Sequence, residues 1–86
     1  MPPPSILERL TRSLRNVFDN DSLVATRELT AQDVDGWDSI NNVRLFIEIE
    51  RDFSIRFSAA EITSLENVGQ LADLIEIKLH DSQMTP

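Results

Sequence analysis

Near the middle of this chain lies the run Gly36-Trp37-Asp38-Ser39-Ile40, where a polar, irregular segment meets apolar residues at helical spacing. The pattern predicts a helix that begins at Ser39, with Asp38 as its N-cap. The first turn of a helix leaves backbone N–H groups without partners and carries the positive end of the helix dipole. A phosphate, bound or covalently attached, is therefore favoured beside Ser39.

The sequence on either side predicts an all-α fold, a small four-helix bundle with a long loop between its first and second helices. We expect helices over about residues 5–18, 39–51, 59–64 and 67–80. Three of the helix starts have capping-box spacing, a short polar residue followed three positions later by Glu or Gln: Ser5 and Glu8, Ser58 and Glu61, Asn67 and Gln70. Within the long loop, Thr30 and Asp33 predict a single helical turn.

The length of the chain, 86 residues, corresponds to one domain with little room for a catalytic cavity. We expect an N-terminal disordered tail over residues 1–4, the helical domain over 5–80 and a polar tail over 81–86. The sequence has no cysteine, which excludes disulfides and thiolate metal sites. It shows neither a signal peptide nor an apolar run of membrane-spanning length, so we expect a cytoplasmic protein.

The net charge of −7 disfavours binding to nucleic acids and to anionic membranes, and favours basic partner surfaces. A calcium loop starting at Asp33 is not supported, because Trp37 and Arg44 stand where oxygen ligands are required. Weak binding of a divalent cation by the acidic loop stays open. The only histidine, His80, lies at the predicted end of the last helix, so a Ser/His/Asp triad is not supported either. We expect no catalytic residue and no metal site.

Taken together, these segments resemble the acyl carrier protein family over nearly the whole chain. The features that match in order and spacing are the long loop, Asp38-Ser39-Ile40, the apolar helix ending near Glu50-Arg51-Asp52-Phe53, the short helix after Phe57-Ser58, and Leu65-Glu66-Asn67-Val68-Gly69-Gln70-Leu71. An Asp-Ser pair alone is usually an ordinary helix cap, and the specificity comes from the combination.

The resemblance implies a non-catalytic carrier whose Ser39 hydroxyl holds a phosphopantetheine arm, derived from coenzyme A, through a phosphodiester. Acyl intermediates would travel on this arm as thioesters between enzymes of fatty acid, polyketide or related secondary metabolism. The implied partners of this monomer are a phosphopantetheinyl transferase, an acyl-loading ligase or acyltransferase, and downstream synthases or transferases. The alternatives are an aminoacyl or peptidyl carrier and an unmodified helical interaction module.

Three residues beside Ser39 each have two interpretations. Asp38 caps the helix, and its carboxylate is either recognised by the modifying enzyme or has no further role. Ile40 stands where the family more often has leucine, and it either contacts partners beside the arm or packs against the first loop. Trp37 is expected to bury its ring and hold the loop against the bundle, with a direct partner contact as the alternative.

The helix over 39–51 is mixed in charge, whereas carriers of fatty acid synthesis typically have an acidic second helix. We therefore expect Asn41, Asn42 and Arg44 to select a dedicated set of enzymes. The same helix has a broad apolar band, expected to be buried on more than one side, with these members: Ile40, Val43, Phe46, Ile47, Ile49 and Phe53. In the family, acyl chains can enter between the helices, and the residues that would line such a space are Val43, Phe46, Ile47, Ile62, Leu71 and Ile75. Ordinary core packing is the alternative.

Overall fold

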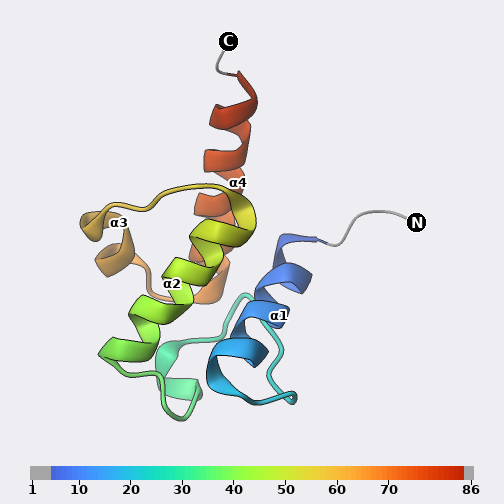
Figure 1. The fold of residues 1–86 in the computed structure, drawn as a ribbon, viewed down its shortest axis with the longest axis vertical. Coiled ribbons are helices and arrows are strands. Elements are labelled where there is room, and N and C mark those ends of the chain that lie inside the picture. Colours follow the sequence, from blue (N-terminus) through green and yellow to red (C-terminus); the bar gives the residue numbers. More distant parts are fainter. Residues whose placement is uncertain (1–4, 85–86) are drawn as a thin grey trace.

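The computed structural model describes residues 5–84, and their side chains as far as residue 80. This part of the chain forms four α-helices and one short 3-10 turn (Figure 1), which confirms the all-α prediction. The elements are α1 (Ile6–Phe18), η1 (Ala31–Asp33), α2 (Ser39–Phe53), α3 (Ala59–Ser64) and α4 (Val68–Met84). The tail predicted over residues 1–4 and the last two residues of the chain lie outside the described part.

Local side-chain caps start the helices, as the sequence predicts. Ser5 Oγ accepts the N–H of Glu8 at 3.1 Å, and Ser58 Oγ accepts the N–H of Glu61 at 3.1 Å. The Glu61 carboxylate returns the bond by accepting the Ser58 N–H at 2.8 Å. Because each cap satisfies an N–H group that the helix itself leaves unpaired, these short polar residues fix where α1 and α3 begin.

The start of α4 differs from its predicted capping box in one bond. Asn67 Oδ1 accepts the N–H of Gln70 at 2.8 Å as expected, but Gln70 Oε1 accepts the N–H of Glu66 at 2.9 Å. The helix also continues to Met84, through residues that we expected to form a polar tail. Each added residue contributes another helical hydrogen bond, and the sequence has no proline or glycine between Gly69 and Pro86 to stop it.

The core lies where α1 packs against α2 and α4, and α4 extends beyond the rest of the bundle (Figure 1). Its most deeply buried side chains are Leu10, Leu14, Leu45, Ile49 and Ile75. The predicted burial of the apolar band of α2 is wrong for Val43 and Ile47, which are 57% and 50% exposed. Ile40 is 71% exposed, so of its two interpretations the accessible residue fits the structure and packing against the first loop does not. Leu45, which is not a member of the predicted band, lies in the core instead.

The long loop is tied to the start of α4 by backbone and side-chain bonds. Leu29 and Arg27 offer their carbonyl oxygens to the N–H groups of Val68 and Gly69, both at 2.9 Å. The Arg27 guanidinium also forms a bidentate ion pair with Asp73, at 3.1 and 2.9 Å. The hydrogen bond and positive charge of Arg27 lower the pKa of the Asp73 carboxyl, and the hydrogen bond and negative charge of Asp73 raise the pKa of Arg27. These contacts satisfy N–H groups at the start of α4 and hold the loop across the bundle.

Candidate functional site

Ser39 is the first residue of α2, and its side chain is exposed. Neither its backbone N–H nor that of Ile40 donates to an acceptor within residues 5–84. These two groups and the helix dipole provide a local positive potential at the position where the hydroxyl is accessible. The donor set therefore fits a phosphodiester attached to Ser39 Oγ, since the charge would lie at the surface beside unpaired N–H groups.

The residues just before Ser39 fold into a tight turn that leads into the helix. Asp38 is the N-cap, as predicted, because its Oδ1 accepts the N–H of Asn41 at 2.8 Å. The Asn41 side chain in turn donates to the carbonyl oxygen of Gly36 at 2.7 Å. Gly36 has φ +85°, a conformation that side chains disfavour, so glycine is needed for the bend. Asn41, which we expected to face partners, thus also stabilises the turn at Gly36 through its side chain.

Trp37 holds the loop against the bundle, in agreement with its first interpretation. Its Nε1–H donates to Asn42 Oδ1 at 2.9 Å, and its ring centroid lies 5.3 Å from that of Phe18. Both Trp37 and Asn42 are partly buried. A tryptophan buries its apolar ring while its N–H still needs an acceptor, and Asn42 supplies that acceptor.

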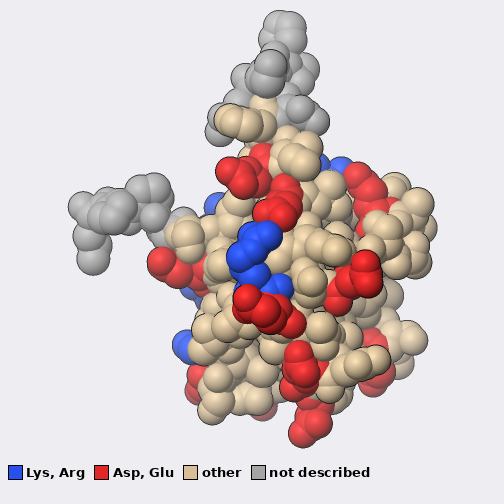
Figure 2. All heavy atoms as spheres, turned by 180° about the vertical axis from the view of Figure 1, so that it is seen from behind, with Lys and Arg blue, Asp and Glu red and all other residues tan. Residues whose placement is uncertain are grey.

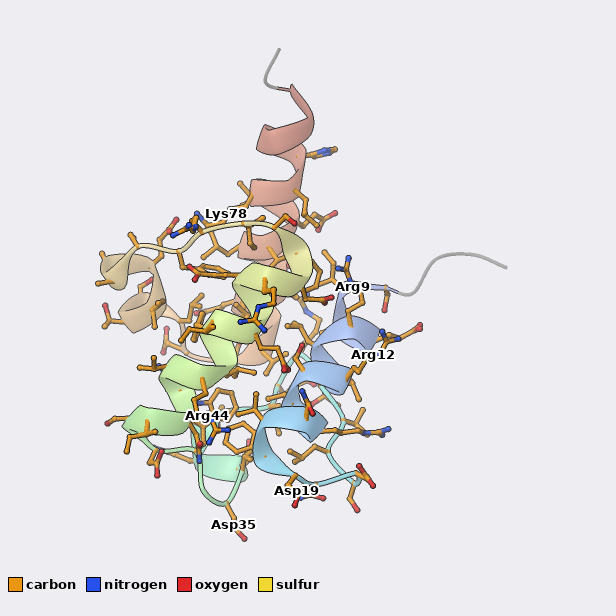
Figure 3. The ribbon with its side chains drawn as sticks, in the orientation of Figure 1. Arg9, Arg12, Asp19, Asp35, Arg44 and Lys78 are labelled. Carbon is orange, nitrogen blue, oxygen red and sulfur yellow. The ribbon has the colours of Figure 1, made fainter. Side chains whose placement is uncertain are left out.

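The outward face of α2 carries an apolar stripe that begins immediately after Ser39. Ile40, Val43 and Ile47 follow the spacing i, i+3, i+7, which places them on one side of the helix. Arg44 is exposed on the first half of the same helix, and Asp35 projects from the loop tip (Figure 3). An exposed apolar stripe beside charged residues is typical of a protein-binding surface.

The acidic residues of α2 are engaged within the molecule, whereas its arginines are not. Glu48 accepts from Asn16 at 2.6 Å, Glu50 accepts the N–H of Phe57 at 2.9 Å, and Asp52 pairs with Arg9 at 3.3 Å. Neither arginine of α2 forms an ion pair within the described residues. Glu48 and Glu50 keep their charge, since their donors are neutral, but these bonds direct the two carboxylates toward the rest of the molecule, while Arg44 is exposed. On the face of the molecule shown in Figure 2, acidic residues are widely spread around a small basic group.

A cavity of about 90 Å³ lies between the long loop, α2, α3 and the start of α4. Its lining is mainly apolar with some polar residues, and consists of Leu29, Thr30, Ala31, Trp37, Asn42, Phe46, Ile62, Leu65, Glu66, Asn67, Val68 and Leu71. Three of the residues that we expected beside such a space, Phe46, Ile62 and Leu71, do line it. The other three do not: Val43 and Ile47 are exposed, and Ile75 is in the core.

The part of the chain that the structure describes offers no support for two other classes of site. Among residues with described side chains, no group of three or more His, Asp or Glu residues is arranged to hold a metal ion. None of the helices in residues 5–84 combines the length and the apolar character needed to cross a membrane.

Comparison with known proteins bears on the whole domain. No protein-family model matches the chain. Among solved structures, the chain is similar to the holo acyl carrier protein from Geobacter metallireducens, determined by solution NMR. The sequences are 42% identical, the match covers 94% of this chain and 93% of that one, and the TM-score is 0.88. At this identity and coverage, the chain belongs to the acyl carrier protein family, whose members are non-catalytic carriers.

Proposed function

We propose that Ser39 is the attachment point for phosphopantetheine, the prosthetic group of the family, and that the protein carries acyl groups on this arm as thioesters. The observation that supports the proposal most directly is the exposed Ser39 side chain at the start of α2, beside two unpaired backbone N–H groups. The similar Geobacter protein is a holo carrier, which is consistent with a covalent arm on this chain.

In the attachment step, the Ser39 hydroxyl oxygen forms a bond to the phosphorus that bears the pantetheine. The pyrophosphate P–O bond of coenzyme A breaks, its nucleotide half leaves, and the hydroxyl proton passes to the phosphopantetheinyl transferase. This chain contributes an accessible nucleophile and a helix start that favours the resulting negative charge. The catalytic groups for the transfer belong to the partner enzyme.

Mass spectrometry tests the attachment. The apo protein is incubated with coenzyme A and a broad-specificity phosphopantetheinyl transferase, and we expect a mass increase of one phosphopantetheine. Ser39→Ala abolishes the increase, whereas Ser22→Ala, which removes another exposed loop serine, leaves it unchanged. A chain that stays unmodified, or that is still modified in Ser39→Ala, contradicts the proposal. The first of these outcomes favours an unmodified interaction module.

We further propose that the face of α2 around Ile40, Val43 and Ile47 is the surface on which partner enzymes dock. Their exposed side chains lie beside the attachment point, so an enzyme that covers them has the arm within reach. Because the acids of α2 are engaged internally while Arg44 is not, the basic surfaces of generic fatty acid enzymes complement this helix poorly. We infer a dedicated set of enzymes, consisting of a loading ligase or acyltransferase and the synthases or transferases that follow.

Partner selection can be measured with generic fatty acid enzymes and this carrier. We expect their kcat/KM to be low with the wild-type protein and to rise at least about tenfold in Arg44→Glu, because the substitution restores an acidic helix. Arg12→Glu makes the same charge change at an exposed residue of α1, outside the outer stripe of α2, and serves as the control. Equal use of wild type and of the enzymes' own carrier would contradict the dedicated-set hypothesis.

The pathway and the cargo belong to the same proposal. We place the carrier in the cytoplasm as a monomer, whose net charge of −7 opposes self-association. Fatty acid, polyketide and related secondary metabolism all supply acyl groups for such an arm, and an aminoacyl or peptidyl carrier would use the same attachment chemistry. A panel of adenylating ligases, with products identified by mass, distinguishes these cargo classes.

A further inference from the structure

Two adjacent stripes run along α2 from the attachment point. Ile40, Val43 and Ile47 form the exposed one. Ser39, Asn42 and Phe46 have the same i, i+3, i+7 spacing, rotated by about 100° around the helix. Along this second stripe the side chains pass from exposed at Ser39 through partly buried at Asn42 to buried at Phe46. It therefore leads from the attachment point into the bundle.

The second stripe ends in the cavity, and Trp37 and Asn42 lie between Ser39 and that cavity. Asn42 and Phe46 both line the cavity, and so does Trp37, which precedes Ser39 by two residues. The hydrogen bond from Trp37 Nε1–H to Asn42 Oδ1 joins the loop side of the cavity to its α2 side. The Trp37 indole also contacts Phe18 of α1, with the two ring centroids 5.3 Å apart.

From these contacts we propose that Trp37 and Asn42 form a gate between Ser39 and the cavity, and that the gate restricts the interior to short acyl chains. The inference rests on the proposed attachment at Ser39. A cavity of about 150 Å³ accommodates the six carbons of benzene, so one of about 90 Å³ holds about four carbons. Longer chains require the Trp37–Asn42 pair to separate, and otherwise stay in solvent.

In the structure Trp37 and Asn42 are joined, and other polar groups around the cavity have partners of their own. Thr30 donates its N–H and hydroxyl to Asp33, Asn67 accepts from Gln70, and Asn42 accepts from Trp37. Opening the gate removes only the last of these bonds, because the other groups find their partners within their own local turns. One indole hydrogen bond and one aromatic contact thus set the cost of admitting a longer chain.

The test uses the holo protein loaded with butyryl or octanoyl groups, each loading being verified by mass. The readout is the rate of thioester cleavage by hydroxylamine, compared with the same acyl group on free pantetheine. In the wild type we expect butyryl to be cleaved at least about threefold more slowly than the free compound, since an enclosed thioester chain is attacked only while it is outside. Octanoyl should be cleaved at the rate of the free compound.

Variants on both sides of the hydrogen bond separate the gate from general loosening. Asn42→Ala and Trp37→Phe both remove the bond, and in each we expect octanoyl to become protected by about threefold. Asn42→Asp keeps an acceptor of the same size and retains the wild-type pattern. Gln32→Ala changes an exposed loop residue that does not line the cavity, and serves as the control. Circular dichroism verifies that each variant is folded.

Fluorescence gives a second readout, because Trp37 is the only tryptophan in the chain. Octanoyl loading should shift its emission in Asn42→Ala and leave it unchanged in the wild type. If loaded Asn42→Ala and Trp37→Phe proteins leave octanoyl as exposed as the wild type does, the gate is overturned while the carrier function stands. If no protein is loaded at all, the proposed function fails, and the gate fails with it.

Discussion

The carbonyl oxygen of Arg27 accepts the backbone N–H of Gly69 at 2.9 Å, and a Cβ built on Gly69 would lie 3.0 Å from that same oxygen. The added carbon would also lie 3.1 Å from the Cβ of Arg27. Glycine is favoured here by the close approach of the loop to α4, in contrast to Gly36, where a Cβ meets open space and the positive φ decides. The packing of the long loop therefore depends on a residue without a side chain.

Gly69→Ala should destabilise the protein by about 1–3 kcal/mol, although alanine is the better helix former, because backbone atoms of Arg27 must move. Urea unfolding measures the change. Glu76→Ala on the exposed side of α4 is the control and should stay within about 0.5 kcal/mol of wild type. A Gly69→Ala variant as stable as wild type would show that Arg27 can shift to accommodate the added methyl group without a loss of stability.

Two isoleucines on α2 should separate stability from function. Ile49 is fully buried, so Ile49→Ala should cost about 2–5 kcal/mol by leaving a cavity. Ile47 is half exposed, and Ile47→Ala should cost less than about 1 kcal/mol while it weakens turnover by partner enzymes. Thermal unfolding and kcat/KM for the loading enzyme measure the two effects. A large loss of stability in Ile47→Ala would instead show that Ile47 contributes to core packing.

Arg9 should stabilise the end of α2 through three contacts. Its guanidinium donates to the Asp52 carbonyl oxygen at 2.8 Å, pairs with the Asp52 carboxylate, and lies 3.9 Å from the Phe53 ring centroid. We expect Arg9→Ala to cost about 1–2 kcal/mol, since a cation at a helix C-terminus also favours the dipole. Arg12→Ala, an exposed position on the same helix, should change urea stability by less than about 0.5 kcal/mol. Similar losses in both variants would refute the specific role of Arg9.

Acid should weaken the attachment of α3. The backbone hydrogen bond from Ser58 and the nearby Lys78, whose Nζ lies 3.0 Å from Oε1, lower the pKa of the Glu61 carboxyl in the folded state. A lowered folded pKa stabilises the protein above the unfolded pKa of about 4.3, and this contribution is lost as the pH falls through the folded value. The Tm of Glu61→Gln should therefore fall less steeply below about pH 4.5 than that of wild type. Parallel curves of Tm against pH for wild type and Glu61→Gln would contradict this expectation. Glu66→Gln, which changes another glutamate, is the matched control.

Asp38 should have a second role besides its cap. Asp38→Asn keeps an oxygen acceptor for the Asn41 N–H, so stability should stay within about 0.5 kcal/mol of wild type. Modification by the phosphopantetheinyl transferase should nevertheless slow, because the exposed carboxylate charge beside Ser39 is lost. Initial rates at low and high salt measure the effect. An unchanged rate at low salt would leave Asp38 as a plain cap.

Features set by neighbouring residues were predictable from the sequence. The caps at Ser5, Asp38 and Ser58 and the helical turn after Thr30 depend on bonds that span three residues, and the structure contains each of them. The position of Ser39 at a helix start follows from the same local chemistry. Because these signals need no knowledge of the tertiary fold, both the architecture and the placement of Ser39 at a helix start were accessible.

Features set by distant residues were not predictable in this way. Ile47 and Ile49 are equally apolar, and only packing in the core, where Ile49 lies with residues of α1 and α4, decides which one is buried. The ion pair of Arg27 with Asp73 joins residues 46 positions apart. The partnership of Asn42 with Trp37 is closer in sequence, but it depends on the path of the loop, which no periodicity describes.

The division of α2 into two stripes has a consequence for how such carriers diverge. Substitutions at Ile40, Val43 or Ile47 alter the surface that enzymes meet without touching the wall of the cavity, while changes at Asn42 or Phe46 do the reverse. On the functions proposed for the two stripes, partner enzymes and acyl cargo can change independently, although both stripes belong to one helix of fifteen residues. An engineer can graft the outer stripe of another carrier onto this bundle and redirect it to new enzymes with its interior intact.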